Sequence, residues 1–250
     1  MARPSDDLYA ALHRSIDRAR AAAPPPPEME RVRFEARRKV AHVVTAVLAV
    51  PLLLFVPYAW ALVLAAAGIG VTSMTWAIER RRLPPELKGP LHEPLAEVLR
   101  TTRRPGEDYP WSPVMYTLAL VLIATAHQFL GLSWAIAFAA YAILGIGDTA
   151  SALVGVAYGR NRLPWNRKKC FEGTIAGLVA GFLAGVVLGT APYVLAGVLI
   201  PTLFLPIVLA GATAGALAET VPHVEDNFIV PLAAASVMLA LAAWTGLPLP

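Results

Sequence analysis

The sequence predicts an all-α fold, a polytopic membrane helix bundle of about seven transmembrane helices with a cytoplasmic N-terminus. Of the 250 residues, 57% are hydrophobic and only 15% are charged, whereas soluble domains carry about 25% charged residues. The mean hydropathy is +0.58. This composition excludes a disordered chain and argues against an ordinary soluble enzyme, because too little charge is present to cover a water-facing surface. The single cysteine, Cys170, excludes a scaffold held by internal disulfides.

Long apolar stretches are the second observation behind this prediction. A helix that crosses a hydrocarbon core about 30 Å thick needs roughly 20 mostly apolar residues. Only Pro57 and Tyr58 separate the first two stretches, which should form a tight hairpin. Prolines inside several stretches predict kinks, and a proline that splits a span would change the count by one. The predicted spans are residues 41–57, 58–78, 112–131, 133–158, 173–190, 192–218 and 227–246.

The distribution of basic residues is the third observation, and it predicts the orientation. All 21 Lys and Arg residues fall within residues 1–42, 79–111 and 159–172. With seven spans these three regions share one side, and cytoplasmic loops are the ones enriched in Lys and Arg. We therefore expect an integral, multi-pass protein of the plasma (inner) membrane, with any site built from these regions facing the cytoplasm.

The regions outside the spans are expected to be helical surface segments. Residues 1–27 read as an accessory segment, a helix over 5–23 followed by the stiff polyproline spacer 24–27. A second surface helix in the loop 79–111 would present Leu91, Leu95 and Val98 to the membrane interface.

Glycines recur at every fourth residue of the predicted fifth span. Such a stripe of small residues lets helix backbones approach closely. Close helix packing is the first interpretation, and a bare groove that holds a lipid chain is the alternative. The glycines are Gly173, Gly177, Gly181, Gly185 and Gly189.

Asp148 is the clearest candidate for chemistry. It lies within the predicted fourth span, where an ionisable residue is costly and is a functional candidate by default. Gly145 and Gly147 precede it and could open the helix at the acid. The alternative is a carboxylate that caps a broken helix.

A dense polar stretch, residues 159–174, follows Asp148. Its cations, among them Arg160, Lys168 and Lys169, come just before Glu172 and the start of a helix. Helix N-termini attract anions, so this stretch predicts a polyphosphate cradle. Carboxylates also have a role in such a site, because a nucleoside triphosphate arrives with Mg²⁺, which prefers oxygen ligands.

Two further polar patches are predicted at the same depth. Arg38, Lys39 and His42 share one helix face at the mouth of the first span. Acids from Glu219 to Asp226, followed by Asn227, lie between the last two spans. Cations for phosphate oxygens, carboxylates for Mg²⁺ and a base for a hydroxyl are the components of phosphoryl transfer. A hydroxyl substrate that arrives from the bilayer would be a lipid alcohol.

These motifs resemble a known family. The sequences Gly147-Asp148-Thr-Ala-Ser-Ala-Leu-Val-Gly155 and Lys168-Lys-Cys-Phe-Glu-Gly-Thr174 are similar to the signature of the dolichol kinase, phytol kinase and CTP-dependent diacylglycerol kinase family. Arg38-Lys-Val-Ala-His42 resembles its N-terminal motif, and Glu219 with Asp226-Asn227 its C-terminal one. Cys170 stands where we expect Ser or Thr.

The resemblance implies that residues 28–250 form a transmembrane lipid kinase domain, which transfers the γ-phosphate of CTP to a lipid alcohol with Mg²⁺ as cofactor. Asp148, Glu172 and His42 would be catalytic, and Asp148, Glu172 and Asp226 would hold the metal. Nucleotide-binding roles fall on Arg38, Lys39, Arg160, Lys168, Lys169 and Asn227.

Two alternatives stay open at this stage. CDP-diacylglycerol synthases share the Asp and Lys-Lys-x-x-Glu-Gly pattern but release pyrophosphate, and they carry C-terminal basic residues that this chain lacks after Lys169. A transporter that uses Asp148 belongs to another class, but transporters generally need polar residues in both halves. No nucleic-acid partner is expected. The alcohol, the choice among CTP, UTP and ATP, and the oligomeric state are left open by the sequence.

Overall fold

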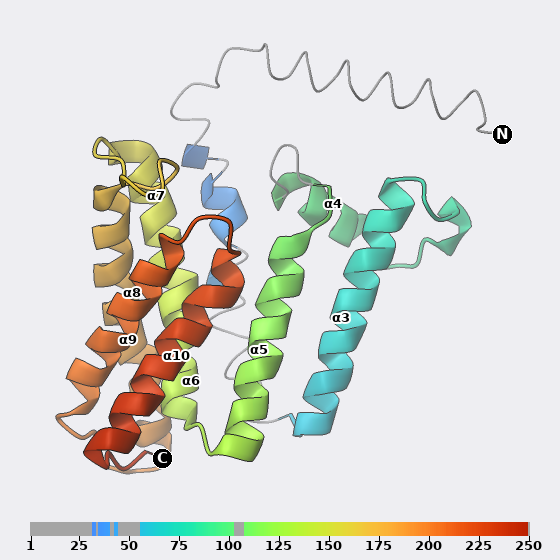
Figure 1. Cartoon of the computed structure of the whole chain (residues 1–250). Helices are drawn as coiled ribbons and strands as arrows, with labels where there is room; N and C mark the ends of the chain where they lie inside the picture. The colour runs from blue at the N-terminus through green and yellow to red at the C-terminus, as the bar shows by residue number, and fades with distance from the viewer. Residues whose placement is uncertain (1–31, 34, 41–42, 45–55, 103–107, 250) are drawn as a thin grey trace.

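The computed structural model describes residues 32–33, 35–40, 43–44, 56–102 and 108–249 (Figure 1). Within these ranges the regular elements are helices, and the one β-type pairing is the isolated bridge between Arg162 and Cys170. The all-helical prediction is therefore confirmed for the described part of the chain. Residues 1–27, His42 and most of the predicted span 41–57 lie outside it, so the count of seven spans and the orientation stay predictions.

Ten labelled helical segments make up most of the described chain. Their bounds are α3 (Tyr58–Glu79), η1 (Pro85–Leu87), α4 (His92–Thr102), α5 (Trp111–Leu130), α6 (Trp134–Ala142), η2 (Ile143–Gly147), α7 (Asp148–Tyr158), α8 (Phe171–Leu195), α9 (Phe204–Glu219) and α10 (Asp226–Thr245). Residues 35–40 are also helical.

Five of the described helices are long and apolar enough to cross a membrane: α3, α5, the continuous run Trp134–Tyr158, α8 and α10. They match the predicted spans 58–78, 112–131, 133–158, 173–190 and 227–246 closely. The predicted boundary near residue 191 is wrong, because α8 continues through Pro192 to Leu195 and α9 starts only at Phe204. Gly197, at φ +64°, lies just beyond the end of α8 and turns the chain back. The apolar helix α9 thus has 16 residues.

The run α6–η2–α7 is the centre of the bundle. In its most apolar part 72% of the residues are buried, against 11% in α3. Helix α8 packs along the whole run, α10 packs on α9, α5 and α6, and α3 lies at the edge against α5 and α4 (Figure 1). A cluster that includes Tyr141, Phe204 and Met238 fills the space between these helices.

The glycine stripe of α8 is the surface that allows this close packing. All five glycines are buried. A Cβ atom on Gly177 would lie 2.9 Å from Cβ of Ser151 and 3.2 Å from the carbonyl oxygen of Gly147. The stripe therefore faces the central run, which favours the packing interpretation over a lipid groove.

A π-helical turn, η2, directly precedes Asp148. The two glycines, Gly145 and Gly147, suggested that the helix could open at this point. The helix instead forms one wider, π-helical turn and continues without a break as α7. Thr149 donates a hydrogen bond from Oγ1 to the carbonyl oxygen of Gly145 across this turn, at 2.5 Å. Turns of this kind are frequent at functional sites.

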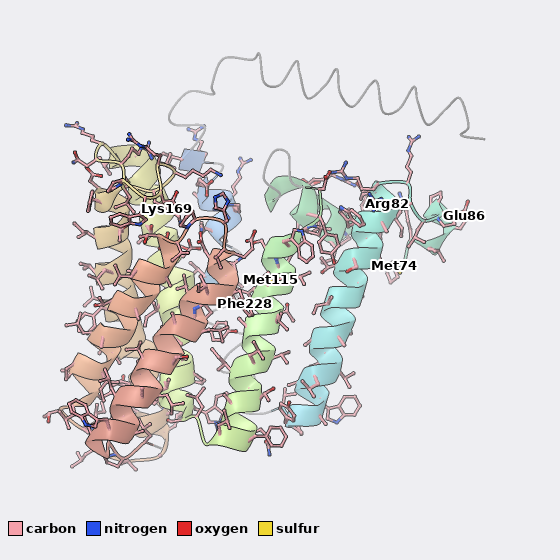
Figure 2. The ribbon with its side chains drawn as sticks, viewed as in Figure 1. Met74, Arg82, Glu86, Met115, Lys169 and Phe228 are labelled. Atoms are coloured by element: carbon pink, nitrogen blue, oxygen red, sulfur yellow. The ribbon has the colours of Figure 1, made fainter. Side chains whose placement is uncertain are left out.

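Tryptophans mark both ends of the bundle. Trp60, Trp134 and Trp244 lie at the end where α3 and α6 begin and α10 finishes, whereas Trp76, Trp111 and Trp165 lie at or beyond the opposite helix ends (Figure 1). Tryptophan is enriched where membrane helices meet the two interfaces. Figure 2 shows Lys169 on one side of the molecule and Arg82 and Glu86 on the other, all at the end that carries Trp76, Trp111 and Trp165.

The surface helix expected in the loop 79–111 is α4. It is joined to α3 by an ion pair of 3.0 Å between Arg100 and Glu79, and Nε2 of His92 lies 3.3 Å from Oε1 of Glu79. Leu91, directly before α4, and Val98 on α4 are exposed, as expected of a helix that lies along a membrane surface.

Candidate functional site

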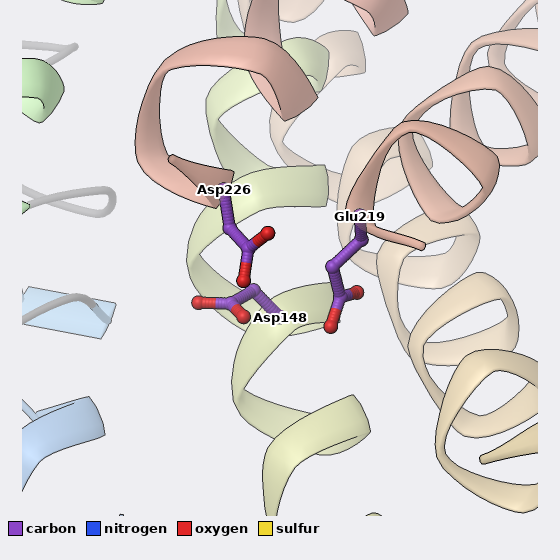
Figure 3. Close-up of side chains that lie close together, drawn as sticks. All are labelled: Asp148, Glu219 and Asp226. Carbon is purple, nitrogen blue, oxygen red and sulfur yellow. The ribbon is translucent and has the colours of Figure 1, made fainter. Parts of the chain in front are cut away.

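Three carboxylates from three helices meet at the end of the bundle that carries Lys169 (Figure 3). Asp148 is the first residue of α7, Glu219 the last of α9 and Asp226 the first of α10. One oxygen of each lies within 4.8 Å of the others, and Asp148 and Glu219 are buried. The carboxylates gather there because α9 ends and α10 begins beside the π turn of the central run.

Two lysines neutralise much of this negative charge. The Lys39 ammonium group contacts the Asp148 carboxylate, and both side chains are 2% exposed. Nζ of Lys169 lies 2.6 Å from Oε1 of Glu219 and 2.9 Å from Oδ2 of Asp226. Ser151, one turn after Asp148, donates a hydrogen bond of 2.7 Å to Oε1 of Glu219.

The surroundings move the pKa values of the two lysines in opposite directions. Burial lowers the pKa of Lys39 below its usual value, and the charge of Asp148 offsets this only in part. Burial also acts to lower the pKa of Lys169, but Glu219, Asp226 and Asp148 outweigh it, and the pKa lies above its usual value. Lys169 is therefore firmly cationic, because it serves several carboxylates.

Hydrogen bonds join the loop between α7 and α8 to the loop between α9 and α10. Nε1 of Trp165 donates to Oγ1 of Thr220, and Nδ2 of Asn166 donates to the carbonyl oxygen of Thr220, both at 3.1 Å. Asn166 also accepts hydrogen bonds from the backbone N–H groups of Lys168 and Lys169. These contacts hold the basic loop, residues 159–170, against the acidic loop, residues 220–225. They also fix the position of the Lys169 backbone.

A cavity of about 1210 Å³ surrounds the cluster. Asp148, Glu219 and Asp226 line it, together with residues of α7 and of the loops between α7 and α8 and between α9 and α10. Its charged and titratable lining residues are Glu35, Arg38, Lys39, Asp148, Arg162, Arg167, Lys168, Lys169, Cys170, Glu219, His223, Glu225 and Asp226.

The structure brings together most of the residues predicted for the site. Lys39, Asp148, Lys168, Lys169 and Asp226 line the cavity. Arg38 also lines it and forms an ion pair of 2.6 Å with Glu35. His42, the predicted base, lies outside the described residues.

Glu172, Arg160 and Asn227 are predicted site residues that do not line this cavity. The Glu172 carboxylate, on the first turn of α8, accepts hydrogen bonds from Nδ2 and the backbone N–H of Asn161, at 2.7 and 3.1 Å. Nδ2 of the buried Asn227 donates to Oγ of Ser112 at 2.5 Å and so ties α10 to the start of α5. Glu172 thus contacts the loop residue Asn161, and among the described residues the group of three neighbouring carboxylates contains Glu219 and not Glu172.

Glu219, Ser151 and Asn166 are site residues to which the sequence analysis gave no role. Glu219 stood in the acidic patch, and its position at the end of an apolar span could have marked it as costly and functional. Ser151 lies three residues after Asp148, on the same helix face. Nothing in the local sequence distinguishes Asn166 from an ordinary loop residue.

The three carboxylates fit a small divalent cation. Mg²⁺ binds oxygen at roughly 2.0–2.1 Å in an octahedron, so opposite ligands lie about 4.2 Å apart. One oxygen from each carboxylate lies within 4.8 Å of the other two, so small side-chain rotations would bring these three oxygens into range. The donors are all oxygens, as Mg²⁺ prefers.

Comparisons with known proteins identify no relative: neither a family model, nor a curated protein, nor a solved structure matches the chain, and the family resemblance therefore rests on the quoted motifs.

Proposed function

We propose that this protein is a membrane-embedded, CTP-dependent kinase that transfers the γ-phosphate of CTP to the hydroxyl group of a lipid alcohol. One observation carries the proposal. Three carboxylates and two lysines, drawn from five separate segments, converge in a single cavity at the end of an apolar helical bundle. Phosphoryl transfer depends mainly on positioning and on electrostatic stabilisation, and this cluster offers both.

The side chains divide into two sets by charge. Asp148, Glu219 and Asp226 would hold Mg²⁺, which when bound neutralises charge on the phosphate oxygens. Lys39 and Lys169 would bind the phosphates that are transferred and released. Further cations on the cavity wall, Arg162, Arg167 and Lys168, would bind the remaining phosphate oxygens.

The depth of the site supports a lipid acceptor. The cluster joins the ends of α9 and α10 to the interior of the run 134–158, which is long and apolar enough to cross a membrane. A hydroxyl at the head of a long apolar tail can reach this depth from the bilayer. The basic loops at the same end support a cytoplasmic orientation, from which CTP would enter.

The charge distribution argues against a transporter. Residues 112–147 and 175–218 contain no Lys, Arg, Asp or Glu, so the half of the bundle away from the cavity offers no second charged site. Cytidylyl transfer stays the nearest alternative, because it uses the same metal and the same nucleotide.

The test is an assay of the purified chain in lipid nanodiscs with Mg²⁺ and CTP labelled at either the α- or the γ-phosphate. UTP and ATP are run in parallel, and phytol, a polyprenol and diacylglycerol serve as acceptors. We expect label from the γ-phosphate in the lipid and release of CDP. Release of pyrophosphate would indicate cytidylyl transfer.

The variant Asp148→Asn should abolish transfer, whereas Glu86→Gln, which neutralises an exposed acid on η1, should leave it unchanged. If no acceptor is phosphorylated with any nucleotide, or if Asp148→Asn retains full activity, the proposed function is wrong.

A further inference from the structure

We infer that the cavity binds its divalent cation and its triphosphate as one coupled unit, because Lys39 and Lys169 occupy the metal-binding carboxylates until phosphate oxygens take over the two ammonium groups. The inference rests on the proposed function and adds a binding mechanism to it. Its observable consequence is that the lysines oppose the binding of metal alone and favour the binding of metal with nucleotide.

Each carboxylate of the cluster is engaged by an ammonium group. Lys39 contacts Asp148, and Lys169 lies 2.6 Å from Glu219 and 2.9 Å from Asp226. These are not surface ion pairs, since Lys39 and Asp148 are 2% exposed and Glu219 is 6% exposed. The lysines therefore compete with a cation for the same three carboxylates.

Charge balance prevents simple addition of a metal ion. Three carboxylates face two ammonium groups in the structure, and a dication that entered beside them would place four positive charges against three negative ones. Like charges in a buried site repel strongly. Movement of one ammonium group away from the carboxylates would relieve this repulsion, and a buried ammonium group that loses its partner is costly unless another anion replaces it.

A triphosphate supplies that replacement. Arg162, Arg167 and Lys168 line the cavity beside the two lysines, so phosphate oxygens attracted to this wall would lie near the ammonium groups. The flexible four-carbon stem of lysine allows such an exchange of partners. Lys169, with 24% of its side chain exposed, has more room to move than Lys39.

The exchange makes metal binding and triphosphate binding reciprocal. Whatever factor the metal adds to triphosphate affinity, the triphosphate must add to metal affinity. Removing a lysine should separate the two effects: the metal alone binds more tightly, while the triphosphate binds more weakly.

The test measures binding rather than turnover. Mn²⁺ replaces Mg²⁺ and is titrated into the full-length chain in nanodiscs, with free Mn²⁺ followed by electron paramagnetic resonance. A CTP analogue with a methylene bridge between the β- and γ-phosphates is titrated separately, with Mn²⁺ and with EDTA. The proteins are the wild type, Lys39→Met, Lys169→Met and Lys169→Gln, with Lys88→Met, an exposed lysine outside the cavity, as the matched control.

We expect the wild type and Lys88→Met to bind the analogue at least about tenfold more tightly with Mn²⁺ than with EDTA. The Lys169 variants should bind Mn²⁺ alone about tenfold more tightly than the wild type and should bind the analogue more weakly. Lys39→Met should do the same, and melting temperatures establish which variants are folded. If Lys39→Met does not fold, the Lys169 variants decide the question.

The inference is overturned if the folded lysine variants bind Mn²⁺ alone no more tightly than the wild type does. That result, together with metal-dependent analogue binding by the wild type, would leave the proposed function standing. A wild type that binds Mn²⁺ but no analogue under any condition would instead refute the proposed function, and the coupling with it.

Discussion

At the scale of single residues, the site depends on charged side chains that are largely shielded from water. Asp148 and Lys39 are almost completely buried against each other, and removal of one partner from such a pair usually costs several kcal/mol, because it leaves an uncompensated charge. A pair of this kind is weak evidence for stability. Its presence at the end of an apolar bundle is better explained by a ligand that uses both charges.

Replacing Glu219 or Glu172 with glutamine, which removes the negative charge, should affect phosphoryl transfer to very different extents. Glu219→Gln should lower kcat/KM for phosphoryl transfer by about 100-fold or more, because it removes a metal-binding oxygen and the partner of Lys169. Glu172→Gln should lower it by less than about tenfold, because that carboxylate bonds Asn161 outside the cavity. Steady-state kinetics on both variants provide the measurement. Equal losses would return the metal role to Glu172.

Glu219 is the site residue that shows why the sequence alone was not enough to choose among the acids. Asp148, Lys169 and Asp226 were predicted from their unusual positions, and the structure brings all three together. Glu219 could not be chosen over Glu172, because both follow from the same argument, an acid at a helix end beside polar residues. Only the packing of α9 and α10 on the central run decides which acid reaches Asp148.

At the scale of elements, the hydrogen bonds between the loops 159–170 and 220–225 position Lys169 in the cavity. Thr220→Val removes the hydroxyl that accepts from Trp165 and should raise KM for CTP about three- to tenfold, with a small effect on kcat. Thr213→Val is the matched control, since both hydroxyls donate to a backbone carbonyl, Thr220 to Leu217 and Thr213 to Leu209, and Thr213 is exposed on α9. Nucleotide titrations of the initial rate distinguish the two variants. Equal KM values would show that the loop contact has no part in nucleotide binding.

The contact between α8 and the central run leaves no room for a side chain at Gly177. Gly177→Ala would force a methyl group to within 2.9 Å of Cβ of Ser151, and overpacking of this kind costs about 1–3 kcal/mol. Gly68→Ala on α3, where nothing lies within 4 Å, should be neutral or stabilising by up to about 1 kcal/mol, since alanine favours helix. Thermal unfolding in detergent tests both. A Gly177→Ala variant as stable as the wild type would mean that the helices separate at little cost.

At the scale of the whole molecule, the long apolar stretches predicted more of the fold than local patterns did. Five long apolar helices match predicted spans because a bilayer imposes one length on every crossing. The predicted end of the fifth span near Pro192 was wrong. Membrane helices tolerate an internal proline, and α8 continues through Pro192 to Leu195. Which helix is central could not be read from hydropathy, because α3 and the run 134–158 are similarly apolar but very differently buried.

The orientation can be tested with single cysteines in a Cys170→Ser background. Lys168→Cys lies in the basic loop beside the cavity and should react with a membrane-impermeant maleimide only in inside-out vesicles. Leu199→Cys, at a position 90% exposed between α8 and α9, should react only in intact cells. Mass-tag shifts on gels report both. The reverse pattern would place the cavity on the outer side.

The π turn before Asp148 has a consequence for the register of the central helix. An α-helix advances by about 100° per residue, and the wider turn Ile143–Gly147 absorbs one extra residue. If these five residues wound as ordinary α-helix instead, Asp148 and Ser151 would be rotated by about that angle, away from Lys39 and Glu219. Deletion of Ile146, which lets the turn relax to α-helix with one residue fewer, should therefore leave Asp148 on nearly the same face. The wide turn thus keeps the two halves of the central helix in register, the apolar half for packing and the polar half for the cavity.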